Sequence, residues 1–209
     1  MRYTPQHKSN THRKIVAVAS EMFRSQGIGK VGVTDLMQRA GLTHGGFYAH
    51  FNSKDALAVE ATRFAFEESA QRLKQQLEES GTGLRFSSSV ERYLSSTHRD
   101  TAAKGCVAAA LAAEVSRQTG PVREAMSAGI RRLIEAVQKM IEADGLNVDA
   151  HAALATMVGA LVLSRAVSDP KLSEQLLSHA RDSLLTPSPK RSGSTKTAAS
   201  KSGGKRIRS

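Results

Sequence analysis

The sequence lacks several features that define other classes of protein. Its only cysteine, Cys106, excludes an intramolecular disulfide and is typical of a reducing compartment. The longest apolar run, residues 152–163, is shorter than the roughly 20 residues that a membrane-spanning helix needs. The N-terminus has no positive-then-apolar signal pattern, which argues against secretion. These absences predict a soluble, cytoplasmic protein with no membrane partner.

Acidic residues are absent from both ends of the chain. Residues 1–14 carry four lysines and arginines, and residues 187–209 carry seven. The whole net charge of +11 therefore lies in two arms, and residues 15–186 are balanced. Basic arms suit a polyanion such as DNA, because each cation near a phosphate releases counterions. A solubilising tail explains the C-terminal arm equally well.

Alternating strand patterns are also missing, and apolar residues recur at helical spacing almost throughout. An all-α fold is therefore expected. Helices are expected over residues 10–27, 34–40, 43–50, 53–80, 84–97, 105–117, 121–144, 148–168 and 171–185. The expected N-caps are Asn10 or Thr11, Thr34, Thr43 and Ser53. Beyond residue 187 large apolar residues almost vanish, which predicts a disordered tail.

The most informative stretch is 33–54, which predicts two short helices joined by a tight turn at Gly41. Such a pair lets the second helix enter the major groove of DNA while the first crosses the backbone. Thr43 and His44 begin the second helix and can reach base edges. Gly45 and Gly46 would let the backbone approach DNA closely. The apolar residues expected to form the shared core are Leu36, Met37, Ala40, Leu42, Phe47 and Phe51.

Residues 11–57 resemble the N-terminal domain of the TetR family of bacterial regulators, most specifically in the run Phe47-Tyr48-Ala49-His50-Phe51-Asn52-Ser53-Lys54. The resemblance implies phosphate contacts from Thr34, Tyr48, His50 and Lys54. It implies base contacts from Thr43, His44, Gly45, Gly46 and Ala49, although family members often carry a larger side chain at the position of Ala49. Taken singly, Tyr48 could be a half-buried core residue, His50 a helix C-terminal cap and Lys54 an ordinary surface lysine.

Over residues 58–186 the resemblance is weaker and implies a helical body whose last two helices pair with those of a second subunit. The residues favour this independently. Small residues recur at Ala152, Ala155, Gly159, Val162 and Ala166, and an apolar stripe runs along Leu172, Leu176, Ala180 and Leu184. Exposing both on a monomer would leave a large apolar patch. The alternative is that both stripes pack inside one subunit.

The same resemblance implies an inducer pocket in the central body. Its candidate lining residues are Phe64, Phe86, Val90, Leu94, Met126, Ile130 and Leu133. Core packing is the alternative explanation for most of them.

Cys106 follows Lys104-Gly105 and begins an alanine-rich helix. A helix N-terminus and a neighbouring lysine favour the reactive thiolate. Residues 105–115 and 122–126 are similar to the NemR-like branch of the TetR family, in which a cysteine at this place senses electrophiles and oxidants. The alternative is that Cys106 is a small buried hydrophobic residue.

These features predict a repressor that binds a palindromic operator as a homodimer and is released by a small molecule or by modification of Cys106. The expected regions are a helix-turn-helix domain with a basic arm over 1–57, a regulatory and dimerisation domain over 58–186, and a tail over 187–209. No enzyme is expected, because no histidine lies near Cys106 in the sequence and no catalytic motif appears. No cofactor or metal ligand set appears either. The alternative is an architectural DNA-binding protein with little sequence preference.

Overall fold

A computed structural model describes residues 5–79, 81 and 83–186. The basic C-terminal tail predicted to be disordered lies outside the described residues, as do the first four residues of the N-terminal arm.

All regular secondary structure in the described residues is helical, which confirms the all-α prediction. The elements in order are α1 (Pro5–Gln26), α2 (Val33–Arg39), η1 (His44–Ala49), α3 (Lys54–Glu79), α4 (Arg85–Tyr93), α5 (Ser96–Asp100), η2 (Ala102–Lys104), α6 (Val107–Val115), α7 (Pro121–Ala143), α8 (Ala150–Ala166) and α9 (Pro170–Leu185).

Several predicted boundaries are wrong. Helix α1 begins at Pro5 rather than at Asn10 or Thr11, and proline suits a first helical turn because its missing N–H needs no partner there. The Thr11 hydroxyl donates to the His7 carbonyl within the helix and caps nothing. Helix α2 is preceded by Gly32, so Thr34 lies inside the first turn and is not the N-cap.

Three other predicted helices differ in type or length. Thr43 does precede the next element, but that element, η1, is a 3-10 helix and the Thr43 side chain makes no capping hydrogen bond. The predicted helix over 84–97 ends at Tyr93, and a separate short helix, α5, follows. The predicted helix over 105–117 begins later, with Cys106 as the N-cap of α6. Ser53 behaves as predicted, since its hydroxyl accepts the Ala56 N–H at 3.0 Å.

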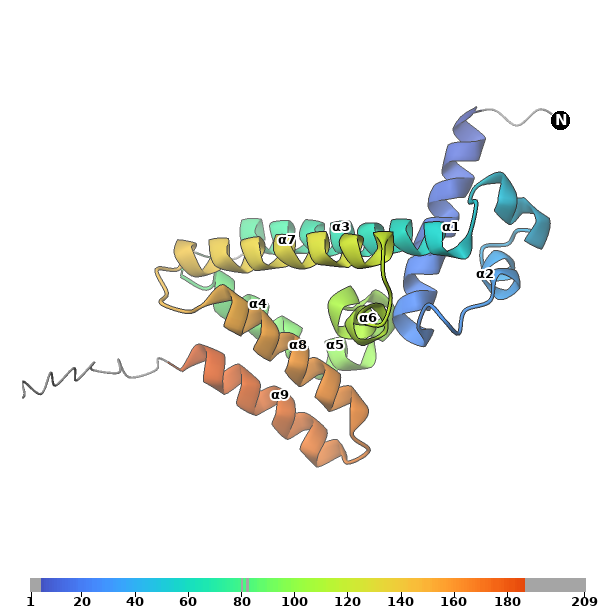
Figure 1. Cartoon of the computed structure of the whole chain (residues 1–209). Coiled ribbons are helices and arrows are strands. Elements are labelled where there is room, and N and C mark those ends of the chain that lie inside the picture. Colours follow the sequence, from blue (N-terminus) through green and yellow to red (C-terminus); the bar gives the residue numbers. More distant parts are fainter. Residues whose placement is uncertain (1–4, 80, 82, 187–209) are drawn as a thin grey trace, which may run out of the picture.

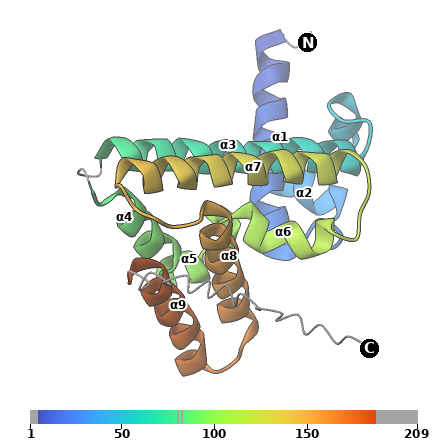
Figure 2. The ribbon, with the colours of Figure 1, turned by 60° about the vertical axis from the view of Figure 1, so that its left-hand side comes forward.

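Helices α3 and α7 lie side by side as a long bar, with α1, α2 and η1 at one end (Figure 1). We call residues 5–53 the head and residues 54–186 the body. Helices α8 and α9 pack together as a hairpin that extends away from the bar (Figure 2), and α5 and α6 lie between the hairpin and the head (Figure 1).

Two hydrophobic clusters hold these parts together. The first runs from the head, with Phe23 and Phe47, into the body, with Leu111 and Met126. The second joins α4, α7, α8 and α9 around residues such as Met140. Packing therefore continues across the predicted domain boundary at residue 57, and the head and the body share one core.

Candidate functional site

The turn between α2 and η1 sets the geometry of the head. Gly41 has φ +69°, which a side chain would strain, and the Leu42 N–H donates to the Met37 carbonyl at 2.8 Å. Phe47 and Phe51 are buried beneath η1, at 1% and 3% exposure. Burying these two rings leaves the remaining residues of η1 facing outward.

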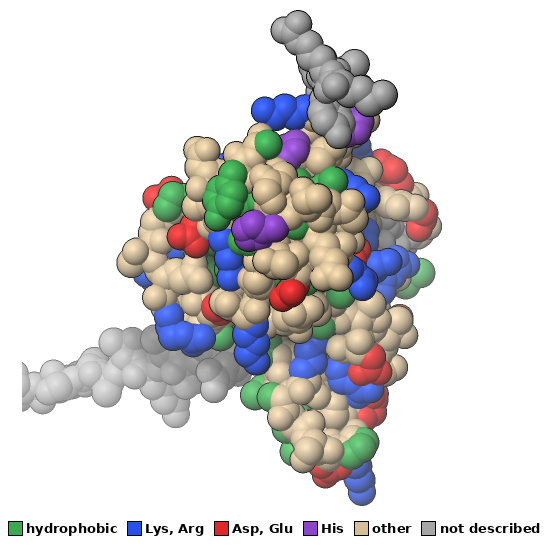
Figure 3. Space-filling view, turned by 90° about the vertical axis from the view of Figure 1, so that its right-hand side faces the viewer, with side chains coloured by type: hydrophobic (Ala, Val, Ile, Leu, Met, Phe, Trp, Pro, Cys, Tyr) green, Lys and Arg blue, Asp and Glu red, His purple; other side chains and the backbone are tan. Residues whose placement is uncertain are grey.

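The structure places the predicted DNA-contacting residues around one surface, which is formed by the head and by Lys54 at the start of α3. Thr34, Thr43, His44, Gly45, Tyr48 and Ala49 are exposed, and Gly46, His50 and Lys54 are partly covered. Tyr48 is 65% exposed, so the alternative that it is a half-buried core residue is wrong. Figure 3 looks onto this end of the molecule and shows lysine and arginine side chains around a face whose centre is largely backbone and uncharged atoms.

Local contacts orient several of these side chains. The Thr34 hydroxyl and His44 Nδ1 are 3.0 Å apart, which links α2 to η1. The Tyr48 ring lies edge-on to Phe47, with ring centres 5.3 Å apart, so the ring is supported while its hydroxyl stays free of the core. Lys54 Nζ donates to the Gly29 carbonyl at 3.3 Å.

His50 differs from the other predicted contacts. Its backbone N–H caps η1, but its Nδ1 atom is buried without a hydrogen-bond partner. Burial lowers the pKa of His50, and the nearby His12 and Lys8 lower it further. His50 therefore does occupy the C-cap position of η1 that the alternative predicts, and the capping group is its backbone N–H.

Two polar contacts that sequence reasoning missed join the head to the body. Arg24, only 4% exposed, donates to the Gly105 carbonyl at 3.2 Å and to Glu68 at 3.0 Å. The Glu114 carboxylate accepts the N–H groups of Ile28 and Gly29 at 2.9 and 2.6 Å. The position of Arg24 next to the buried Phe23 in α1 was the one signal in the sequence for the Arg24 contact.

The body contains a pocket of about 560 Å³ whose lining comes from α3, α4, the 95–106 segment, α7 and α8. Its apolar lining residues are Leu73, Leu133, Val137, Leu154 and Met157. Cys106 and Leu133 are the two residues from the sequence-based candidates that line it.

The other six candidates are not at the pocket wall. Phe64, Met126 and Ile130 pack in or against the first hydrophobic cluster, and Phe86, Val90 and Leu94 are fully buried in the second. Their helical spacing identified the apolar faces correctly, but another helix covers those faces.

Cys106 is 7% exposed, and its backbone N–H donates to His98 Nε2 at 3.1 Å. The other ring nitrogen of His98, Nδ1, lies 2.7 Å from the Tyr93 carbonyl. Because Nε2 must accept, His98 is neutral with its proton on Nδ1. Burial lowers the pKa of His98, and the charges of Arg165 and Arg72 lower it further. The hydrogen bond to the Tyr93 carbonyl raises it.

One peptide unit is thus held from both sides. Its carbonyl, from Gly105, accepts Arg24 of the head, and its N–H, from Cys106, donates to His98 of the pocket wall. A Cβ at Gly105 would lie 3.0 Å from His98 Nε2 and 3.1 Å from Arg165, so this position is tight for any side chain. Sequence reasoning missed His98 because the bends over 100–106 break the helical period that would place it.

The Tyr93 hydroxyl also faces Cys106. It is buried and makes no well-aligned hydrogen bond. Burial raises the pKa of Tyr93 well above its usual range, and the neighbouring Cys106 raises it further. A buried donor without a well-aligned partner is uncommon and suggests a ligand atom at this position.

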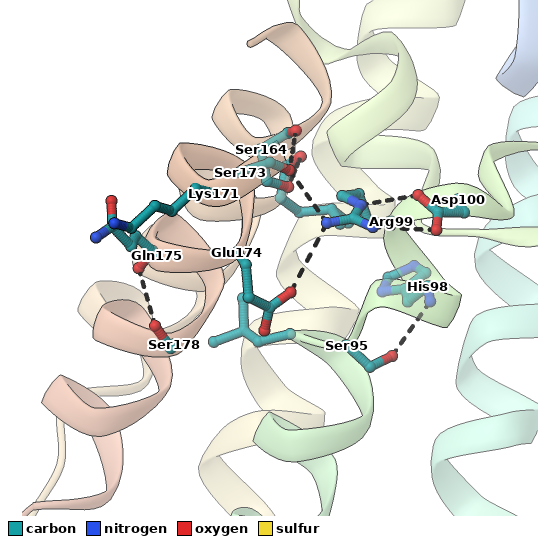
Figure 4. A network of polar contacts seen from close by, with 12 residues as sticks. Ser95, His98, Arg99, Asp100, Ser164, Lys171, Ser173, Glu174, Gln175 and Ser178 are labelled. Carbon is teal, nitrogen blue, oxygen red and sulfur yellow. Dashed lines mark hydrogen bonds and ion pairs between the residues drawn. The ribbon is translucent and has the colours of Figure 1, made fainter. Parts of the chain in front are cut away.

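A polar network behind the pocket connects it to the α8–α9 hairpin. Arg165 of α8 donates to the carbonyls of His98 and Arg99 at 2.7 and 2.9 Å. Arg99 in turn donates to the Ser173 hydroxyl of α9 at 3.1 Å, and the Ser173 hydroxyl donates to the Ser164 carbonyl at 2.7 Å (Figure 4). The pocket wall is therefore fixed to both helices of the hairpin.

Most of the predicted dimer residues lie on the uncovered side of this hairpin, but Ala180 and Leu184 pack against the second hydrophobic cluster within the subunit. Ala155, Val162 and Leu172 are exposed, and Gly159, Leu176 and Ala180 are partly covered. A Cβ at Gly159 would meet nothing within 4 Å. The buried face of α8 is a different one, carrying Ala153, Leu154, Met157 and Leu161. The small-residue stripe of α8 is therefore not packed inside the subunit.

Among the described residues, no group of three or more histidine, cysteine, aspartate or glutamate side chains could hold a metal ion. Within the same residues, no helix is long and apolar enough to cross a membrane.

Two family models match the chain. The model of bacterial regulatory proteins of the tetR family matches residues 15–61, and a tetracyclin repressor-like C-terminal domain matches residues 84–180. The first match contains the whole of α2 and η1, and the second contains most of the body.

Two relatives carry regulatory names. The HTH-type transcriptional regulator YvdT of Bacillus subtilis is 36% identical over 53 residues, which are 25% of this chain and 27% of YvdT. The HTH-type transcriptional repressor NemR of Escherichia coli K12 is 26% identical over 136 residues, which are 64% of this chain and 68% of NemR. Both are regulators rather than enzymes, in agreement with the expectation that this chain is not an enzyme.

Solved structures share the fold. Reduced NemR of E. coli has a TM-score of 0.71 at 23% identity and covers 86% of this chain and 100% of NemR. A TetR regulator of Chloroflexus aurantiacus has a TM-score of 0.70 at 24% identity, with coverages of 84% and 94%. AibR in complex with isovaleryl coenzyme A and operator DNA has a TM-score of 0.61 at 14% identity, with coverages of 85% and 99%.

Proposed function

Because the chain belongs to the TetR family of bacterial regulatory proteins, we propose that it represses transcription by binding a palindromic operator as a homodimer. Filling of the body pocket or modification of Cys106 releases the DNA. The observation that carries this proposal is the Gly105–Cys106 peptide, which is bonded to the head on one side and to the pocket wall on the other.

The exposed surface of η1 supports specific DNA binding. Thr43 and His44 present short polar groups to base edges, and the Tyr48 hydroxyl reaches a phosphate. Gly45 has no atom within 4 Å of a Cβ position, so only a partner outside the subunit would require glycine there. A two-fold dimer through the α8–α9 hairpins sets two such surfaces about one helical turn apart, or a small multiple of it.

Modification of Cys106 is a chemical route to release. Its thiol adds to the β-carbon of a quinone or an unsaturated carbonyl compound: the S–C bond forms, the C=C electron pair moves toward the carbonyl oxygen, and the thiol proton ends on the adduct. No atom is lost. Cys106 lines the pocket, so the added group occupies pocket volume beside the Gly105–Cys106 peptide, and we expect it to turn that peptide.

The first experiment is selection of binding sites from random duplex DNA at moderate salt, with and without a quinone. One enriched palindrome that is lost on treatment supports both parts of the proposal. Cys106→Ser and Cys106→Ala should bind the same palindrome and keep it under quinone. If they are released like the unaltered protein, Cys106 is not the sensor and a pocket ligand remains.

The coupling itself can be tested at Arg24. Arg24→Met removes the bond to Gly105, so we expect operator binding within a few-fold of the original and little release by the inducing compound. The matched control is Glu68→Gln, which removes the ion pair of Arg24 and leaves the Gly105 contact. Equal release in both variants would mean that the signal takes another route.

The architectural alternative gains no support from membership of this family. The tail cations are expected to add non-specific affinity to a specific repressor. Deleting 187–209 should flatten the salt dependence of DNA binding and preserve preference for the palindrome. Loss of that preference would favour the architectural alternative.

A further inference from the structure

Polar and apolar lining residues occupy different walls of the pocket. Helices α7 and α8 contribute only apolar side chains, namely Leu133, Val137, Leu154 and Met157. The hydroxyl groups and cations of the lining come from α3, α4 and the 95–106 segment, which also contribute the apolar Leu73. A ligand that fits both walls has an apolar body and a polar group at one side.

The charge of the polar wall has one sign. Arg72, Arg92 and Lys104 line the pocket, and no aspartate or glutamate does. Residues 15–186 as a whole carry equal numbers of acidic and basic residues, so this imbalance is local to the pocket.

A further cation lies behind the same wall. The Arg165 guanidinium donates to two backbone carbonyls, and no carboxylate of the described residues lies within ion-pair distance of it. Burial lowers the pKa of Arg165, and Tyr93, Cys106 and Asp100 oppose that change. The positive charges of Arg165 and Arg72 also lower the pKa of His98, which favours its neutral form. The charge of Arg165 therefore adds to that of the exposed cations Arg72, Arg92 and Lys104 around the pocket.

The buried Tyr93 hydroxyl makes no well-aligned hydrogen bond, and its one polar neighbour of note is the weakly accepting Cys106 thiol, so a stronger acceptor can replace the thiol there. An oxygen atom of a ligand would accept the hydroxyl hydrogen and would be attracted by the surrounding cations. This buried donor and the one-sided charge therefore point to the same ligand chemistry.

We propose that the pocket binds an amphipathic carboxylate, with its anionic group toward Arg72 and Lys104 and its apolar body against α7 and α8. This inference rests on the proposed regulatory function and specifies the ligand class of that site. A volume of about 560 Å³ is in the range of sites that hold small organic molecules.

The test uses three probes with the same chain length and different head groups: decanoate, decan-1-ol and decylamine, each below its aggregation concentration. Calorimetric titration of the full-length protein should give at least about tenfold tighter binding for decanoate than for the other two. Equal binding of all three, or preference for the amine, would overturn the inference.

Variants test whether the preference for decanoate arises in the pocket. Arg72→Gln combined with Lys104→Gln should weaken decanoate binding by about tenfold and leave decanol binding unchanged. The matched control is Lys139→Gln, an exposed cation of α7 outside the pocket, which should change neither. Decanoate binding that persists in the double variant would place the anion elsewhere, for example on the basic tail, and would overturn the inference.

The same protein samples distinguish failure of the proposed ligand class from failure of the proposed repressor function. Operator selection with no preference for decanoate rejects the ligand class and leaves the repressor function. Decanoate binding that depends on Arg72 and Lys104, in a protein that selects no palindrome, supports the ligand class and rejects the repressor function.

Discussion

The head and the α8–α9 hairpin both expose large hydrophobic side chains, but the neighbours of those side chains differ. In the head, Tyr48 is 65% exposed among polar and small residues such as Thr43 and Gly45. On the hairpin, Val162, Leu163 and Leu172 are 39%, 53% and 42% exposed beside alanines and a glycine.

The difference indicates which kind of partner each surface suits. An aromatic ring with a polar tip among hydrogen-bonding groups fits a partner rich in phosphates and base edges. A patch of aliphatic and small residues fits a close apolar contact, such as a second copy of the same surface. Each prediction below changes one of these surfaces and leaves the other intact.

The largest effect is expected from a charge on the hairpin. In the proposed dimer, Val162→Glu places one carboxylate from each subunit in the interface, at a cost of several kcal/mol, so dimerisation should weaken by about 100-fold or more. Sedimentation would show monomers, and operator affinity would fall with the loss of the second head. The control is Ser127→Glu on the exposed face of α7, which should remain dimeric. A Val162→Glu protein that is still dimeric would move the interface elsewhere.

A smaller effect is expected in the head. Tyr48→Phe keeps the ring contact with Phe47 and removes the hydroxyl, so operator affinity should fall by about tenfold, the value of a hydrogen bond to a charged group. Melting temperature and dimerisation should not change, because the hydroxyl has no partner in the subunit's core. Fluorescence anisotropy with labelled operator measures the effect. Unchanged affinity would remove Tyr48 from the phosphate contacts.

The smallest effects come from a matched pair of glycines. Neither Gly45 nor Gly159 has an atom within 4 Å of a Cβ position, so alanine fits the isolated subunit at both. We expect Gly45→Ala to weaken DNA binding by a few-fold and to leave the dimer intact. Gly159→Ala should raise helix propensity by about 0.5–1 kcal/mol yet weaken dimerisation by a few-fold. If Gly45→Ala weakened the dimer and Gly159→Ala weakened DNA binding, the assignment of the two surfaces would be wrong.

The sequence predicted the head better than the pocket, and the reason is physical. The run from Phe47 to Lys54 is local, so one stretch of chain specifies both the buried rings and the exposed side chains around them. The start of α1 was predicted too late, because the turn from Pro5 to Asn10 is polar and carries no apolar stripe.

Pocket residues depend on how separate helices meet. Periodicity showed that Phe86, Val90 and Leu94 lie on an apolar face, but it could not show that α7, α8 and α9 cover that face completely. Likewise, His98 reaches Cys106 only through the bends over 100–106, which no repeating pattern encodes. Cys106 itself could be predicted, because its position at a helix start is a local feature.

The peptide between Gly105 and Cys106 also has a consequence for how such a regulator evolves. A peptide unit is planar and nearly rigid, so a rotation that breaks the bond at its N–H also moves its carbonyl away from Arg24. Any compound that rotates this peptide plane breaks the same contact with Arg24, whatever the compound's own shape. In the proposed mechanism, the pocket lining can therefore change toward new compounds while the head keeps its operator.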